Sequence, residues 1–447
     1  MRLRESIAVL AARGAGSLSR GLRVGGGSSV PGIVVERLDP GFVRRRAARL
    51  TGGVLVVSGT NGKTTTTAMI RAILAEHGAS TVSNESGANL LHGVATALLR
   101  VRGATMGVFE LDEAWLPKVA PLLNPRVVVL TNVFRDQLDR FGEAESVARL
   151  LSRGAAAEEG ATVVANADDP LLWHALPGEP LGFGVRPEPS RADEATHRAD
   201  AEPETCPRCG RSLVFEVRTI AHLGVARCPA GDWATAEPSL ALRMVSSDGL
   251  EATVVETGGV RFRLPIGGIH NVYNAAAAIA GTRAVGVPVE TAARALEKFR
   301  ARFGRSEVLT VGGRTVRMLL TKNPAGASVV IRELARDPGV GAVVVAVNDQ
   351  VADGRDISWI WDVDYERLAG MDVPVVPAGR RAADVAVRLR YAGATPLPAR
   401  TDAKQAVLAA IAAAPAGSTV AVLATYTAML DARAALAGGR RKAVVDA

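Results

Sequence analysis

The pattern of apolar positions after residue 50 alternates between short strands and longer helices. Apolar runs predict buried strands at residues 54–58, 106–111, 127–131 and 162–166. Residues 64–77 have a helical pattern, and Gly78 follows as a stop signal. Because strands that alternate with helices form mostly parallel sheets, the fold class is α/β with a parallel sheet.

A second, smaller α/β unit is predicted from residue 306 to residue 447. It starts with a hairpin that turns at Gly312-Gly313, continues with a helix after Ala325, and has strands at residues 342–347, 373–377 and 419–424. In the later part of the first unit, residues 240–264 alternate around a turn at Gly258-Gly259, and residues 271–285 form an Ala-rich helix. We therefore predict a central domain over residues 51–305 and a C-terminal domain over residues 306–447.

The first 50 residues are rich in Arg and Gly and contain one helical stretch near the start. Such a segment either packs on its own domain or touches a membrane surface as a basic amphipathic helix. No apolar run approaches the roughly 20 residues of a membrane-spanning helix. The run at residues 7–12 is too short, and too close to Glu5 and Arg13, for a secretory signal. The expected location is the cytoplasm, with the inner face of the plasma membrane as a further option.

Charge and composition narrow the choice of partner. The net charge is +8, but the basic residues are scattered, so genome bias explains this charge better than an anionic partner does. Only 4% of the residues are aromatic, which argues against a stacking surface for single-stranded nucleic acid. No nucleic-acid partner is predicted.

A glycine turn between the first strand and the first helix predicts a phosphate-binding loop. Its residues are Gly59, Thr60, Asn61, Gly62, Lys63, Thr64 and Thr65. Backbone N–H groups and the helix dipole would attract phosphate, Lys63 would contact the β- and γ-phosphates, and Thr64 would bind magnesium. Val57 stands where the usual Walker pattern has its first glycine, so this is not the common GTPase or kinase loop.

This tight loop resembles that of the Mur-ligase and folylpolyglutamate synthase group, and further motifs in family order match the Mur ligases. The matching residues are Glu110; Asn132, Asp136 and Asp139; Asn166-Ala-Asp-Asp-Pro170; Asn271 and Asn274; and Arg305 in Gly304-Arg-Ser-Glu307. The resemblance implies that Glu110 binds magnesium, that Asn271 and Asn274 lie at the adenine, and that Arg305 reaches the nucleotide. ATP and Mg²⁺ are the implied cofactors.

The chain also departs from the better-known Mur ligases. Only about fifty residues precede the loop, too few for their UDP-sugar domain, and Lys118 is the only lysine between residues 64 and 297, where many of them carry a carbamylated lysine. The chain is more similar to the branch of the family that amidates lipid II. That resemblance is carried by a cysteine insertion, by residues 322–326 with 348–362, and by residues 424–430.

This branch implies ATP-dependent conversion of the D-glutamate α-carboxylate of the lipid II stem peptide to D-isoglutamine, for peptidoglycan synthesis, through an acyl phosphate. The ammonia would come from a separate class-I glutaminase of the GatD type, in a heterodimer. All three cysteines lie in the insertion, so the chain cannot hydrolyse glutamine alone. Within the same resemblance, Asp356 completes the partner's Cys-His pair; a loop residue that caps a short helix is the ordinary alternative. Lys63, Glu110 and Asp356 are the catalytic candidates.

The cysteines resemble an incomplete zinc ribbon over residues 206–233. Cys206 and Cys209 form one knuckle, and Cys228 begins a second knuckle that lacks its last cysteine. Structural zinc needs four ligands, and neither His222 nor Asp232 has the expected spacing to supply the fourth. A bound structural zinc and a ribbon held only by packing both remain open.

Two other functions remain open at this point. A folylpolyglutamate-synthase-like ligase would share the phosphate loop but not the cysteine insertion or the segment at residues 353–362. A nucleotide-binding subunit without chemistry of its own would bind ATP without consuming it in the presence of a carboxylate substrate.

Overall fold

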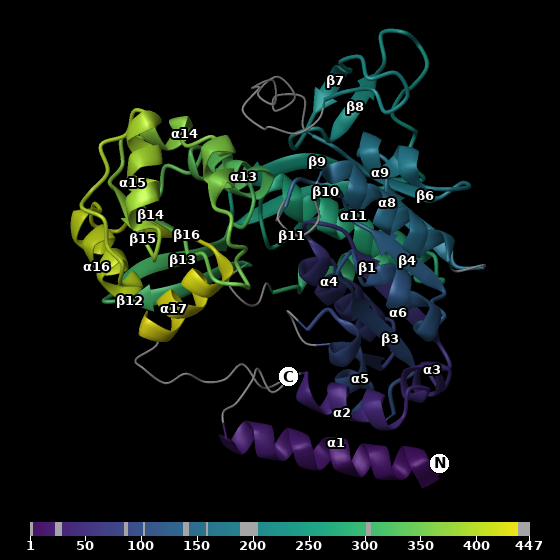
Figure 1. The fold of residues 1–447 in the computed structure, drawn as a ribbon. Coiled ribbons are helices and arrows are strands. Elements are labelled where there is room, and N and C mark those ends of the chain that lie inside the picture. Colours follow the sequence, from purple (N-terminus) through teal and green to yellow (C-terminus); the bar gives the residue numbers. More distant parts are fainter. Residues whose placement is uncertain are drawn as a thin grey trace.

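The computed structural model describes residues 3–22, 29–84, 88–101, 103–136, 143–157, 160–187, 204–300 and 305–436. Its described strands form a nine-stranded sheet, a five-stranded sheet and a two-stranded hairpin, and the two larger sheets lie side by side (Figure 1). No helix in these ranges is long and apolar enough to cross a membrane.

The nine-stranded sheet has the order β11-β10-β9-β6-β5-β4-β1-β3-β2. Its strands are β1 (Gly53–Ser58), β2 (Thr81–Val82), β3 (Met106–Glu110), β4 (Val127–Leu130), β5 (Thr162–Asn166), β6 (Leu181–Arg186), β9 (Leu240–Asp248), β10 (Ala252–Thr257) and β11 (Val260–Leu264). All neighbours from β2 to β9 pair in parallel, whereas β9, β10 and β11 pair antiparallel. The mostly parallel sheet is therefore confirmed, and the alternating stretch around Gly258-Gly259 extends one of its edges.

Helices cover both faces of this sheet, as β1 illustrates. Leu55 and Val57 belong to one core cluster with α4 (Lys63–Glu76) and α11 (Ile269–Arg283), while Val54 and Val56 belong to the cluster on the opposite face. Because successive strand residues face opposite sides, a continuous apolar run indicates a sheet that is buried on both faces. The helices of the opposite face include α5 (Leu91–Leu99), α6 (Leu116–Leu123), α8 (Ala144–Ala156) and α9 (Pro170–Ala175), and α12 (Val289–Glu297) lies with α4 and α11.

Three helices precede the first strand, where the sequence predicted one helical stretch. They are α1 (Leu3–Leu22), α2 (Val30–Leu38) and α3 (Phe42–Ala47). The buried Glu5 carboxylate of α1 forms ion pairs with Arg46 at 3.0 Å and Arg49 at 3.1 Å. Apolar residues of all three helices join the core of the central sheet, so α1 packs on its own domain. The sequence prediction missed α2 and α3, which have only 9 and 6 residues and therefore depend on tertiary packing for their stability.

The five-stranded sheet has the order β12-β13-β16-β14-β15. Its strands are β12 (Arg305–Val311), β13 (Arg314–Leu320), β14 (Val340–Ala346), β15 (Val375–Ala378) and β16 (Thr419–Ala424). The predicted hairpin at Gly312-Gly313 is present, with positive φ angles of 57° and 76°. The helices of this sheet are α13 (Pro324–Leu334), η2 (Ser358–Asp362), α14 (Glu366–Ala369), α15 (Ala382–Tyr391), α16 (Ala403–Ala413) and α17 (Tyr426–Leu436).

The two sheets also share packing contacts. Ala325 and Val329 of α13 belong to the core of the central sheet, and Leu250 from the turn between β9 and β10 belongs to the core of the C-terminal sheet. The guanidinium of Arg317 on β13 forms an ion pair with Glu251 in the same turn. These contacts set the C-terminal sheet beside the carboxyl ends of the central strands.

The turn Asn166-Ala-Asp-Asp-Pro170 connects α9, α11 and the segment after β4 through hydrogen bonds. Asp169 caps α9 by accepting from Leu172 N at 3.0 Å and also accepts from Val133 N at 2.8 Å. Asp168 accepts from the Tyr273 hydroxyl at 2.8 Å, and its pKa is raised because burial disfavours its charge. Two fully buried carboxylates thus fix α9 and α11 at this corner.

Candidate active site

The phosphate loop lies between the carboxyl end of β1 and the first turn of α4, as the sequence predicted. Gly59 and Gly62 have φ angles of 125° and 85°, in the left-handed region that favours glycine. A Cβ atom on Gly62 would lie 2.0 Å from Oδ1 of Asn274. Asn274 on α11 therefore requires glycine at position 62, and the loop is pressed against that helix.

Lys63 is the first residue of α4, and its side chain is only 11% exposed. Its Nζ donates to the carbonyl oxygens of Gly59 and Thr60 and lies 3.2 Å from Oε1 of Glu113. Burial alone would lower the pKa of Lys63, but nearby carboxylates, Glu113 and Glu110 first among them, raise it. Lys63 therefore keeps its positive charge at neutral pH, inside the loop.

Glu110 ends β3 beside Thr64. The Thr64 hydroxyl donates to Oε2 of Glu110 at 2.7 Å, which brings together the two oxygen ligands predicted for magnesium. The buried Asn84 side chain fixes this strand end, because its Nδ2 donates to Glu110 O at 2.9 Å and its Oδ1 accepts from Glu110 N at 3.0 Å. A hydroxyl and a carboxylate at this spacing suit the preference of Mg²⁺ for oxygen ligands.

Two further carboxylates at this site were missed by the sequence reasoning. Asp112 and Glu113 lie two and three positions after Glu110 and are 6% and 5% exposed. Both contribute to the raised pKa of Lys63. The signal in the sequence was a run of three acidic residues within four positions at the end of a buried strand.

Asn271 and Asn274 lie in the first turns of α11 and are buried against α4. The Thr66 hydroxyl donates to Asn274 Oδ1 at 3.4 Å, and Asn274 Nδ2 donates to Asn271 Oδ1 at 3.3 Å. The fold therefore places these two residues beside the phosphate loop, although Asn274 is 208 positions from Thr66 in the sequence. Their contact with adenine stays a prediction.

The segment after β4 contacts the loop through Asn132. Asn61 N donates to Asn132 Oδ1 at 2.8 Å, and Asn132 Nδ2 donates to Asn61 O at 3.1 Å. Asp136 forms an ion pair with Lys322. Asp139 lies outside the described residues, and only the backbone of Arg305, in β12, is described.

The C-terminal sheet also supplies side chains to the phosphate loop. Lys322 Nζ donates to Thr60 O at 3.3 Å, and Asn323 Nδ2 donates to Asn61 Oδ1 at 2.9 Å. Asn323 is buried and also caps α13 by accepting from Gly326 N. The sequence marked Lys322 and Asn323 only as part of a family motif, and no role for them was predicted.

Asp356 lies on the exposed surface of the C-terminal domain, in the loop before η2. Its Oδ1 accepts from Ser358 N at 2.8 Å, the capping contact expected of an ordinary loop residue. Nearby Asp353 is buried and accepts from Thr427 N at 2.8 Å, which ties this loop to the start of α17. A fixed loop thus presents one carboxylate to solvent.

The cysteine cluster has a fourth donor that spacing did not predict. Donor atoms of Cys206, Cys209, Cys228 and Asp232 all lie within 4.8 Å of one another. Asp232 Oδ1 is 3.4 Å from the sulfur of Cys206, and the sulfurs of Cys209 and Cys228 are 3.5 Å apart. The hairpin of β7 (Val214–Arg218) and β8 (Gly224–Arg227) sets this arrangement. Three thiols and a carboxylate suit a tetrahedral zinc, so Asp232 is the candidate for the fourth ligand.

His222, the other candidate for the fourth ligand, does not join the cluster. Its ring is fully buried, and Nε2 lies 3.3 Å from Oδ1 of Asp169. The insertion is therefore anchored in the central domain, whose core includes Ile220 and Leu223, while Cys206 and Cys228 belong to a separate small cluster. The β7–β8 hairpin projects from the central domain in Figure 1.

The fold and this site define a Mur-type ligase. Residues 57–184 match the family model of the Mur ligase middle domain. A pseudomurein peptide ligase type C from Methanothermus fervidus superposes with a TM-score of 0.67 at 20% identity, over 86% of this chain and 78% of that one. MurF ligase from Thermotoga maritima, in complex with ADP, superposes with a TM-score of 0.64 at 16% identity, over 92% and 84% of the two chains.

Residues 320–429 match the family model of the MurT ligase C-terminal domain. The MurT subunit of lipid II isoglutaminyl synthase (glutamine-hydrolyzing) from Streptococcus pneumoniae is 34% identical over 98% of each chain. The chain belongs to the MurT family.

Proposed function

We propose that this chain is the ligase subunit of a lipid II isoglutaminyl synthase. It would use ATP to amidate the α-carboxylate of D-glutamate in the lipid II stem peptide, with ammonia from a separate class-I glutaminase of the GatD type. The observation that carries the proposal is the joint placement of Lys63, Thr64 and Glu110 at a phosphate loop, in a chain that matches a MurT subunit from end to end.

The chemistry follows from the weakness of a carboxylate as an electrophile. A carboxylate oxygen attacks the γ-phosphorus of ATP and ADP leaves, which gives an acyl phosphate. Ammonia then attacks the acyl carbon, the bond to the phosphate oxygen breaks, and the amide and inorganic phosphate are released. Such phosphoryl transfer depends mainly on positioning and on charge stabilisation, so no covalent enzyme intermediate is required.

The proposed roles divide between the loop and its neighbours. Lys63 would stabilise the negative charge of the transferring phosphoryl group, and Arg305 would reach the nucleotide. Thr64 and Glu110 would hold Mg²⁺, which supplies further charge neutralisation when bound. Asn271 and Asn274 would contact the adenine.

Asp356 would act at the glutaminase rather than at the phosphate loop. The chain has three cysteines, and all belong to the four-donor cluster, so the nucleophile for glutamine hydrolysis must come from a partner. The exposed carboxylate of Asp356 is available to a partner's histidine, which it would orient as the third member of a triad. Ile7 and Leu10 are exposed on the outer face of α1. This face would contact the membrane that carries lipid II.

The test is reconstitution. The purified chain and a class-I glutaminase subunit are incubated with lipid II, ATP, Mg²⁺ and either glutamine or ammonium chloride. Mass-spectrometric fragmentation then locates any new amide, because the change in mass is small. We expect D-isoglutamine with both nitrogen sources.

The other two functions give different outcomes. ATP consumption that depends on added glutamate and a small carboxylic acid, without amidated lipid II, would support a folylpolyglutamate-type ligase. ATP binding without consumption under either condition would support a non-catalytic subunit.

A further inference from the structure

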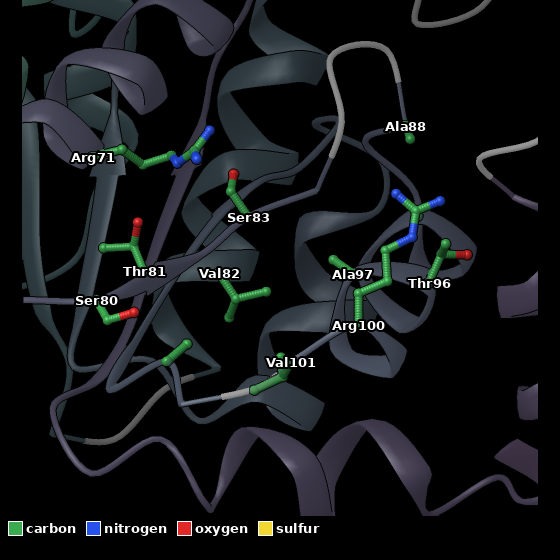
Figure 2. Close-up of a pocket in the computed structure, with 12 residues that line it drawn as sticks. Arg71, Ser80, Thr81, Val82, Ser83, Ala88, Thr96, Ala97, Arg100 and Val101 are labelled. Atoms are coloured by element: carbon green, nitrogen blue, oxygen red, sulfur yellow. The ribbon is translucent and has the colours of Figure 1, made fainter. Parts of the chain in front are cut away.

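A cavity of about 220 Å³ lies beside β2, at the edge of the central sheet (Figure 2). Its lining combines α4, the strand β2 and its flanks, and α5 with the segment that follows it. Gly93, Thr96 and Ala97 of α5 are buried, whereas Ser80 and Arg100 are exposed. The cavity is therefore buried on the side of α5 and open to solvent near Ser80 and Arg100.

The lining is basic and rich in hydroxyl groups. Arg71 on α4 and Arg100 at the end of α5 lie on either side of Ser83 in Figure 2, and Ser80 and Thr81 add further hydroxyls. No Asp or Glu is among the described residues that line the cavity. Both arginines already have interactions within the chain, but a guanidinium carries five N–H donors and can serve several acceptors. Two arginines and hydroxyl groups suit a phosphate ligand.

The position of the cavity connects it to the site proposed for catalysis. Ser83 lines the cavity, and the next residue, Asn84, holds the backbone of Glu110 through two hydrogen bonds. β2 is the last strand of its sheet, so its outer edge offers backbone groups that the sheet does not use. A ligand in the cavity would therefore contact Ser83, the neighbour of Asn84, and Asn84 holds the end of β3 at Glu110.

The volume of the cavity suits a small charged group better than a complete nucleotide. Pockets that enclose complete small molecules are usually about 300–1,000 Å³, and this cavity is smaller. We propose that it binds the diphosphate of the lipid-linked substrate and thereby holds the substrate on the central domain. This inference rests on the proposed function, because it names a subsite for that substrate.

The first test compares two substrates that differ in the diphosphate. Arg71→Gln with Arg100→Gln is assayed with ammonium chloride, on lipid II and on the soluble muramoyl pentapeptide that lacks the diphosphate. We expect the KM for lipid II to rise roughly tenfold to a hundredfold, with the KM for the soluble substrate and for ATP unchanged. The charge-preserving pair Arg71→Lys with Arg100→Lys should recover part of the loss. Arg261→Gln, at the opposite edge of the sheet, is the matched control.

A direct binding measurement keeps the inference separate from the reaction. With the nucleotide site saturated by a non-hydrolysable ATP analogue and Mg²⁺, inorganic pyrophosphate is titrated calorimetrically into the wild type and into the Gln pair. Weaker binding in the Gln pair supports the cavity as a diphosphate site, and equal binding overturns it. Equal KM values for lipid II also overturn it, even if amidation proceeds normally. If the wild type amidates neither substrate, the proposed function fails, and the titration still decides whether the cavity binds diphosphate.

Discussion

The phosphate-loop region and the Asp356 loop are built in opposite ways. Lys63, Thr64 and Glu110 are held by partners within the same chain, in the phosphate loop, at the end of β3 and in the segments that follow β2 and β3. Asp356 is exposed, and its only described hydrogen bond is to Ser358 two residues later, although Asp353 fixes the loop around it. The first region is organised by contacts within the chain, whereas the second presents an exposed carboxylate to which we assign a function only beside a partner subunit.

Substitution at Asp356 gives the sharpest separation between the two regions. In the heterodimer, Asp356→Asn should lower glutamine-dependent amidation by roughly three to four orders of magnitude, because the partner's histidine loses the carboxylate that orients it. Amidation with ammonium chloride should not change. Asp402→Asn is the matched control, since Asp402 also caps a helix at the surface. Equal losses with glutamine and ammonia would contradict the shared triad.

Loss of Lys63 should affect both nitrogen sources alike. Lys63→Ala is expected to lower amidation by about a hundredfold to a thousandfold, because the phosphoryl group loses its buried positive charge. Initial rates with glutamine and with ammonia measure the effect. Lys118→Ala, a surface lysine that lies over the Trp115 ring, should behave as wild type. Normal rates in Lys63→Ala would remove the phosphate loop from the mechanism.

The buried Asp353 tests whether rigidity of the exposed loop matters. Asp353→Asn weakens the contact with Thr427 and should lower the free energy of unfolding by about 1–3 kcal/mol. Glutamine-dependent amidation should fall about tenfold to a hundredfold through misplacement of Asp356, with little change for ammonia. Thermal denaturation and the two assays are compared with Asp349→Asn, which lies in the same loop and pairs with Arg380 at the surface. An unchanged glutamine rate would mean that Asp356 does not depend on this support.

The cysteine cluster should contribute least to the reaction. Asp232→Ala is expected to weaken zinc binding by at least about tenfold and to lower the melting temperature, because one of the four donors is lost. Elemental analysis after dialysis measures the metal, and Glu216→Ala on the same hairpin is the control. Amidation with ammonia should stay close to wild type. A proportional loss of amidation and zinc would assign the cluster a role beyond folding.

The sequence predicted features formed by neighbouring residues and missed contacts between residues that are far apart in the sequence. The loop around Lys63 and the strand that ends at Glu110 are each a continuous stretch of sequence, so residue spacing and apolar pattern were enough to predict them. Asn323 contacts Asn61 across 262 positions, and Asp232 reaches the cysteines only through the register of the β7–β8 hairpin. Such contacts depend on tertiary structure, which local patterns do not encode. The first 50 residues show the same limit, because their three helices are defined by packing.

The contacts of Lys322 and Asn323 with the central domain have a consequence for turnover. A nucleotide that enters or leaves beneath Lys322 and Asn323 requires the breaking of the Asn61–Asn323 bond and the Lys322–Asp136 pair. A hydrogen bond and a partly buried ion pair of this kind contribute about 1 kcal/mol each, which adds to the packing of Ala325 and Val329 against the central core. Weakening the contacts of Lys322 and Asn323 would then accelerate product release at the expense of tight nucleotide binding.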